Sequence, residues 1–156
     1  MSTSTEISRS GAEISLREVT KDTVRTICNL HVSESQKQFV APNAVSIAEA
    51  HFTKEAWFRA IYADEVPVGF VMLWEDPTEG RYFLWRFMID EKFQDRGYGR
   101  RALELVIHHV KENSMAKGLR LTYCKGEGSP QAFYEKMGFA DTGKILDREH
   151  EMMRAL

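Results

Sequence analysis

A chain of 156 residues, 43% of them hydrophobic, is long enough for one domain with a sizeable core. The formal net charge of −2 excludes the broad basic surface that is typical of nucleic-acid-binding proteins. The cysteines Cys28 and Cys124 form neither a disulfide framework nor a CxxC motif, and no apolar run approaches the about 18 residues of a membrane helix. We expect a cytoplasmic, metal-free protein with reduced cysteines and with no nucleic-acid or membrane partner.

The first third of the chain predicts a tail, a strand and two helices. Residues 1–13 are rich in Ser and Thr and predict a flexible tail, whereas residues 14–156 predict a single domain. Residues 14–19 alternate as a strand does, and Thr20 or Asp22 caps a helix that runs to Leu30. Residues 31–43 look irregular, and Ser46 is expected to cap a short helix that ends near Thr53.

The middle of the chain predicts three consecutive strands and then a helix. Strands at 57–63 and 66–74 are joined by the tight turn Asp64-Glu65, and a second turn leads into a strand at 81–89. Apolar residues then recur on one face of a helix, at Leu103, Val106, Ile107 and Val110.

The last third predicts a strand at 119–124, a helix and a final hairpin. Ser129 is the cap of this helix, Pro130 its first residue and Gly138 its stop, and strands at 139–145 and 151–156 follow. Three consecutive strands cannot all be joined by parallel crossovers, so the sheet must be mixed. We therefore expect an α/β (α+β) fold with a mixed, mostly antiparallel sheet of six to seven strands and helices on both faces.

The loop Gln94–Arg101, between a strand and a helix, predicts a phosphate site. Its two glycines let the backbone approach a ligand closely, and the helix start presents unpaired N–H groups and a partial positive charge. Arg96, Arg100 and Arg101 add full positive charges. The alternative is a tight turn whose arginines are merely solvated.

Residues 97–102 also fit the G-x-G-x-x-A dinucleotide fingerprint, which is a weak signal on its own. The loop comes late in the chain and leaves too few residues for two mononucleotide-binding halves. A P-loop is excluded because the chain contains no G-x-x-x-x-G-K-[ST].

Two motifs resemble those of the GNAT N-acetyltransferases. Gln94-Asp-Arg-Gly97-Tyr-Gly99 fits the signature Q/R-x-x-G-x-G/A, and residues 129–139 resemble a later motif in which N-x-x-A is followed by Y-x-x-x-G-F. Ser129 replaces the usual Asn, which affects one side-chain hydrogen bond to the cofactor. The order of elements matches from about Ile14 to the C-terminus. Shorter similarities, at 30–32, 68–70 and 86–90, make the bacterial diamine, spermidine and spermine acetyltransferases the most similar subgroup.

The resemblance implies acetyl-CoA as donor and a small primary amine, such as spermidine or spermine, as acceptor. The CoA pyrophosphate would lie against the N–H groups of Gly97, Gly99, Arg100 and Arg101, and the pantetheine arm would pair with the strand edge at 87–89. A backbone N–H near Met88 would polarise the thioester carbonyl. The implied cofactor contacts are Phe87, Met88 and Ile89; Gln94, Asp95, Arg96, Gly97, Tyr98, Gly99, Arg100 and Arg101; and Ser129, Ala132, Phe133 and Tyr134.

Tyr134 is the catalytic residue that the resemblance implies. When an amine attacks the thioester, a nearby phenol can protonate the leaving thiolate. By periodicity alone, Tyr134 would instead be a core aromatic of an amphipathic helix.

Deprotonation of the acceptor amine requires a base, because a free amine has a pKa near 10. Glu34, Glu75 and Asp76 are the candidates, with a solvated surface acid as the alternative reading of each. Gln36 shares the segment of Glu34, which by resemblance borders the acceptor site. Trp57, Trp74 and Trp85 could contact a cation or fill the core, and an acetyl relay through Cys124 is a further alternative.

Two other functions stay open from the sequence. The chain could acetylate an antibiotic or an amino acid, or it could bind acyl-CoA as a sensor without catalysis. The open edges of a mixed sheet also favour a homodimer.

Overall fold

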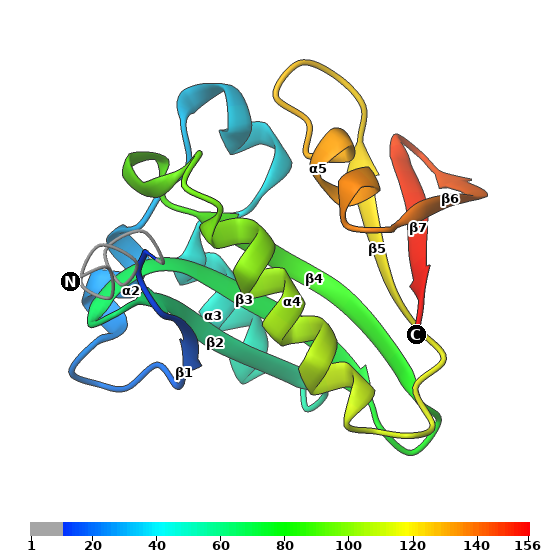
Figure 1. The fold of residues 1–156 in the computed structure, drawn as a ribbon, viewed down its shortest axis with the longest axis horizontal. Coiled ribbons are helices and arrows are strands. Elements are labelled where there is room, and N and C mark those ends of the chain that lie inside the picture. The colour runs from blue at the N-terminus through cyan, green and yellow to red at the C-terminus, as the bar shows by residue number, and fades with distance from the viewer. Residues whose placement is uncertain (1–10) are drawn as a thin grey trace, which may run out of the picture.

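The computed structural model describes residues 11–156, and it confirms the predicted α/β architecture (Figure 1). The described residues form a seven-stranded sheet in the order β1-β2-β3-β4-β5-β7-β6. Its strands are β1 (Ile14–Arg17), β2 (Ala56–Ala63), β3 (Val66–Asp76), β4 (Arg81–Ile89), β5 (Gly118–Cys124), β6 (Ala140–Leu146) and β7 (Glu149–Ala155). Neighbouring strands are antiparallel except β4 and β5, which are parallel, so the sheet is mixed as expected.

Helices cover both faces of this sheet. The α-helices are α2 (Val24–Asn29), α3 (Asn43–His51), α4 (Tyr98–Lys111) and α5 (Gln131–Lys136), and the 3-10 helices are η1 (Glu34–Phe39) and η2 (Glu91–Phe93). In Figure 1, α4 crosses the front of the sheet and α3 lies behind it. The predicted order of elements is therefore confirmed, with η1 inside the segment expected to be irregular.

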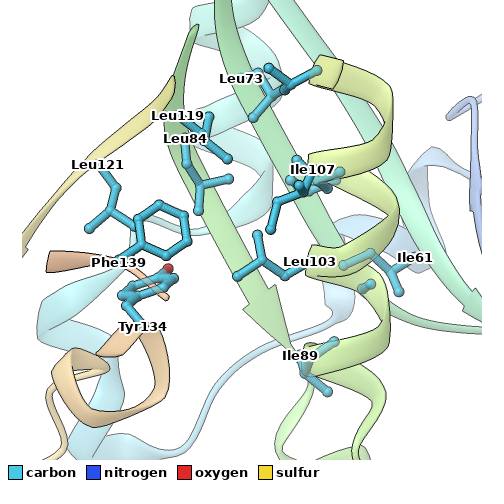
Figure 2. Close-up of a cluster of buried hydrophobic side chains, with 14 of the residues drawn as sticks. Ile61, Leu73, Leu84, Ile89, Leu103, Ile107, Leu119, Leu121, Tyr134 and Phe139 are labelled. Atoms are coloured by element: carbon cyan, nitrogen blue, oxygen red, sulfur yellow. The ribbon is translucent and has the colours of Figure 1, made fainter. Parts of the chain in front are cut away.

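The core has two parts because the sheet buries both faces. Leu103, Val106, Ile107 and Val110 of α4 are buried on one face, as their spacing predicted. Figure 2 shows Leu103 and Ile107 pointing towards sheet residues such as Leu84. On the opposite face, a smaller cluster is formed by Ile27, Val32, Ala60, Tyr62, Phe70, Met72 and Met88.

Three helix starts differ from the sequence predictions. Helix α2 begins at Val24 after Thr23, so neither Thr20 nor Asp22 is its cap. Helix α3 begins at Asn43, and Ser46 lies buried inside it with its hydroxyl donating to the carbonyl of Pro42 at 3.4 Å. Ser46 is therefore not a cap, because Pro42 sets the helix start earlier. Helix α5 begins at Gln131 after Pro130, one residue later than predicted, although Ser129 Oγ still accepts from the Gln131 amide at 3.3 Å.

The predicted tail, residues 1–13, lies outside the described residues for its first ten positions. Its last two residues contact the domain: the amide of Glu13 donates to Asp64 at 3.0 Å, and the carbonyl of Ala12 accepts from Arg101. These contacts attach the start of β1 to the β2–β3 turn and to α4.

Candidate active site

A cleft of about 1000 Å³ opens where β4 and β5 separate. The two strands pair only at Tyr82–Leu119 and Phe83–Arg120, and beyond these pairs they diverge (Figure 1). A β-bulge explains the divergence: Arg86 pairs with Met72 and Leu84 with Leu73, so Trp85 is an extra residue in β4. A bulge bends its strand and increases the local twist.

The glycine loop forms one end of this cleft. Gly97 precedes α4 with a φ of 81°, a left-handed conformation that favours glycine. The amides of Tyr98, Gly99 and Arg100 belong to the first turn of α4, where backbone N–H groups lack helical partners. The amide of Arg101 donates to the Gly97 carbonyl at 3.3 Å, so it is already used within the helix.

The three arginines of the loop point in different directions. Arg100 lines the cleft and pairs with Glu104 at 3.0 Å. Arg101 donates to the Ala12 carbonyl, because successive helical residues project about 100° apart. Arg96 donates to the Lys92 carbonyl at 3.2 Å and lies over the Phe93 ring. Of the three arginines, only Arg100 therefore lines the cleft within the described chain.

The other cofactor residues from β4 and the loop do line the cleft. Phe87, Met88 and Ile89 form its wall along β4, and Gln94, Asp95 and Tyr98 lie at the loop end. The Gln94 side chain donates to the carbonyl of Ile89 at 2.8 Å. This bond fixes the loop against the end of β4.

Helix α5 supplies the facing wall. Ser129, Phe133 and Tyr134 line the cleft, whereas Ala132 is exposed and does not. The Ser129 hydroxyl donates to the Cys124 carbonyl at 2.6 Å, and the Phe133 ring stacks on Phe87 with centroids 6.0 Å apart.

Tyr134 is nearly enclosed, with 7% of its surface exposed. Its ring packs against Phe139 (Figure 2), with centroids 5.7 Å apart. Burial alone raises the pKa of Tyr134 well above its ordinary value. The phenol therefore stays protonated at neutral pH.

The three acids expected as bases lie outside the cleft lining. Glu34 pairs with Lys37 at 2.7 Å, and the bond to Lys37 lowers the pKa of Glu34. Asp76 pairs with Arg81, whose hydrogen bond lowers the pKa of Asp76. Glu75 lies at the far end of β3, 2.6 Å from His109 on α4.

The three tryptophans and Cys124 do not lie at one common site. Trp85 and Cys124 line the cleft. Trp57 stacks on His109 with centroids 4.1 Å apart, away from the cleft. Trp74 lines a second cavity of about 510 Å³.

Glu149 is a cleft residue that sequence reasoning missed. It is the first residue of β7 and pairs with Cys124 of β5. The sequence suggested only a hairpin turn around 147–149. No local pattern could have found it, because its place depends on β7 pairing with β5.

Among the described residues, no helix is long and apolar enough to cross a bilayer. Nor do residues 11–156 contain a group of three or more His, Cys, Asp or Glu side chains that could hold a metal ion.

Known proteins resemble this chain in sequence and in fold. The model of the acetyltransferase (GNAT) family matches residues 24–139. A spermine/spermidine N(1)-acetyltransferase of Bacillus subtilis strain 168 is 30% identical over 153 residues, which cover 92% of this chain and 99% of that protein. An acetyltransferase structure from Thermus thermophilus gives a TM-score of 0.73 at 19% identity, with 92% and 97% of the chains covered. The PaiA N-acetyltransferase of Thermoplasma acidophilum, solved in complex with coenzyme A, gives 0.69 at 15% identity and covers 92% and 99%.

The family match and the curated relative thus define an acyltransferase. The chain is a member of the GNAT acetyltransferase family. Its relationship to this family and its fold class, both expected from the sequence, are confirmed.

Proposed function

We propose that this protein transfers an acetyl group from acetyl-CoA to a primary amine, a polyamine such as spermidine or spermine or another small amine, by direct attack in a ternary complex. One observation carries the proposal: a single cleft joins the glycine loop at the start of α4 to the protonated, buried phenol of Tyr134. A cytoplasmic location is part of the same proposal.

The cleft fits acetyl-CoA, which would supply an activated acetyl thioester. The first-turn amides of Tyr98, Gly99 and Arg100 suit its pyrophosphate, and the Arg100 guanidinium adds positive charge. Along β4, the wall at Phe87, Met88 and Ile89 offers backbone groups to the amides of the pantetheine arm, since β5 has diverged there. A backbone N–H near Met88 is the proposed donor to the thioester carbonyl.

The chemical step needs an amine nitrogen to bond to the acetyl carbon while the carbon–sulfur bond breaks. Tyr134 gives its proton to the departing sulfur, and the proton that leaves the new amide nitrogen returns to the phenolate, directly or through a water molecule. Burial keeps the Tyr134 hydroxyl in the donating form before the step. Cys124 has no covalent role in this scheme.

The proposal that the acceptor is a polyamine rests on the name of one related protein. The Bacillus subtilis protein that is 30% identical to this chain is named a spermine/spermidine N(1)-acetyltransferase. Antibiotics, amino acids and a purely acyl-CoA-sensing role are the alternatives that experiment must separate.

Release of free CoA from acetyl-CoA tests the proposal directly. Spermidine, spermine, amino acids and aminoglycosides would be supplied in turn to the purified protein. We expect turnover with polyamines and little with the other two classes. Tight binding of acetyl-CoA without turnover of any amine would contradict the enzymatic function and favour an acyl-CoA sensor.

A further inference from the structure

Glu149 is an exposed residue that lines the cleft on the side formed by β5 and β7. It lies directly opposite Cys124 in the β5–β7 ladder, and both residues line the cleft. The hydroxyl of Thr122, also a cleft residue, donates to Glu149 Oε1 at 3.3 Å. This bond orients the carboxylate, and the other oxygen is left for a ligand.

The charge on Glu149 is not neutralised by the protein. Nearby acids have basic partners: Glu151 pairs with Arg120 at 3.1 Å, and Glu49 pairs with Arg86 at 2.9 Å. Among residues 11–156, Glu149 has no such ion pair. The other carboxylate among the described residues that line the cleft is Asp95, which belongs to the glycine loop.

The cleft has room for an acceptor that is longer than the reacting group. Phe83 and Trp85 line both the cleft and the second cavity of about 510 Å³, so the two spaces adjoin along β4. The aromatic side chains of this passage suit the methylene segments of an alkyl amine, whereas Arg81, Lys117 and Arg120 of the second cavity would repel its cationic end.

We infer that Glu149 binds a second, positively charged nitrogen of the acceptor and so selects diamines and polyamines over monoamines. This inference rests on the proposed function. The bound nitrogen cannot be the attacking one, because a carboxylate stabilises the ammonium form, and an ammonium has no lone pair for attack. Glu149 thus holds one end of the acceptor while the neutral amine at the other end reaches the thioester.

Two acceptors of equal chain length test this role, 1,4-diaminobutane and butylamine. In Glu149→Gln, the KM for 1,4-diaminobutane should rise about tenfold, as expected for a lost charged hydrogen bond. The KM for butylamine, the affinity for acetyl-CoA and the kcat for both amines should stay within about threefold of wild type. Glu151→Gln is the matched control, because Glu151 lies two residues along β7 and is already paired with Arg120.

Charge reversal gives a second readout. Glu149→Lys should lower activity on 1,4-diaminobutane further and raise activity on 4-aminobutanoate, whose far end is anionic. Equal losses with 1,4-diaminobutane and butylamine, or the same loss in Glu151→Gln, would overturn the role of Glu149 while leaving the acetyltransferase proposal intact. Absence of turnover by the wild-type protein with every amine would overturn both.

Discussion

Gln36 and Gln94 exchange two hydrogen bonds through their side-chain amides, at 2.9 and 3.2 Å. Gln36 belongs to η1, which lines the cleft, and Gln94 precedes the glycine loop. Since Gln94 also donates to the carbonyl of Ile89, one side chain holds η1, the loop and the end of β4 together. The segment proposed to face the acceptor is therefore tied to the segment proposed to hold the donor.

Gln36→Ala should weaken the binding of both substrates. It removes two hydrogen bonds to Gln94 and the one that Gln36 accepts from the Ser33 amide, which together should cost about 1–2 kcal/mol of unfolding free energy. We expect KM for acetyl-CoA and for the amine to rise together by about threefold to tenfold, with a smaller change in kcat. Steady-state kinetics and urea unfolding measure these effects. Ser35→Ala, an exposed change in the same 3-10 helix, is the control and should leave both constants unchanged.

Gly99→Glu should abolish most of the affinity for acetyl-CoA. A Cβ at Gly99 would lie 3.6 Å from Ile89 and Phe133, an ordinary contact distance, so the position tolerates a small side chain. A carboxylate there would repel the pyrophosphate at the start of α4. Calorimetry should show a loss of roughly 100-fold, or about 3 kcal/mol, in Gly99→Glu and near-normal binding in Gly99→Ala. Equal binding by both variants would remove the phosphate site from the start of α4.

The sequence predicted the parts of the fold that depend on local signals. Alternation of apolar residues located the strands, and the periodicity of Leu103, Val106, Ile107 and Val110 gave the buried face of α4. Gly97 marks the change from loop to helix after β4, but residues 98–101 of the predicted loop already belong to α4. The left-handed φ of 81° at Gly97 shows why glycine is needed at the start of that helix.

The sequence did not predict which strands pair over long distances or in which direction the loop side chains point. The final hairpin was predicted, but nothing local indicates that β7, and not β6, pairs with β5 and brings Glu149 beside Cys124. The three arginines of the loop look equivalent as a motif, yet Arg101 turns towards Ala12 and Arg96 towards Lys92. The divergence of β4 from β5 depends on the bulge at Trp85, which an apolar run does not reveal.

Glu75 is expected to contribute to the stability of the fold and not to catalysis. Its carboxylate lies 2.6 Å from His109, and the His109 ring stacks on Trp57. This contact joins β3, β2 and α4 at the end of the sheet remote from the glycine loop. Glu75→Ala should lower the free energy of unfolding by about 1–2 kcal/mol and leave kcat/KM unchanged. A large fall in kcat with normal stability would return Glu75 to the candidate bases.

Tyr123 should make the stability of the protein sensitive to alkaline pH. Burial, and then the hydrogen bond to Asp141 at 2.7 Å, raise the pKa of Tyr123 from 10.0 to about 12. Because the folded-state pKa exceeds the unfolded value, this stabilisation is complete below pH 10 and is lost as the pH rises towards 12. Urea unfolding between pH 8 and pH 12 should therefore show a weaker decline in Tyr123→Phe than in wild type. Identical pH profiles for the two proteins would contradict the raised pKa.

Tyr134→Phe should separate catalysis from binding. The change removes one oxygen atom and keeps the ring that packs against Phe139, so stability and acetyl-CoA affinity should stay near wild type. Loss of the proton donor should lower kcat by about 100-fold. In the wild-type enzyme, kcat/KM should rise with pH as the acceptor amine, whose pKa is about 10, loses its proton. Tyr134 should cause no fall over that range, because burial keeps its hydroxyl protonated. Wild-type turnover in Tyr134→Phe would mean that another group protonates the leaving sulfur. A fall in kcat/KM near neutral pH that disappears in the variant would show that the phenol ionises far more easily than its burial implies.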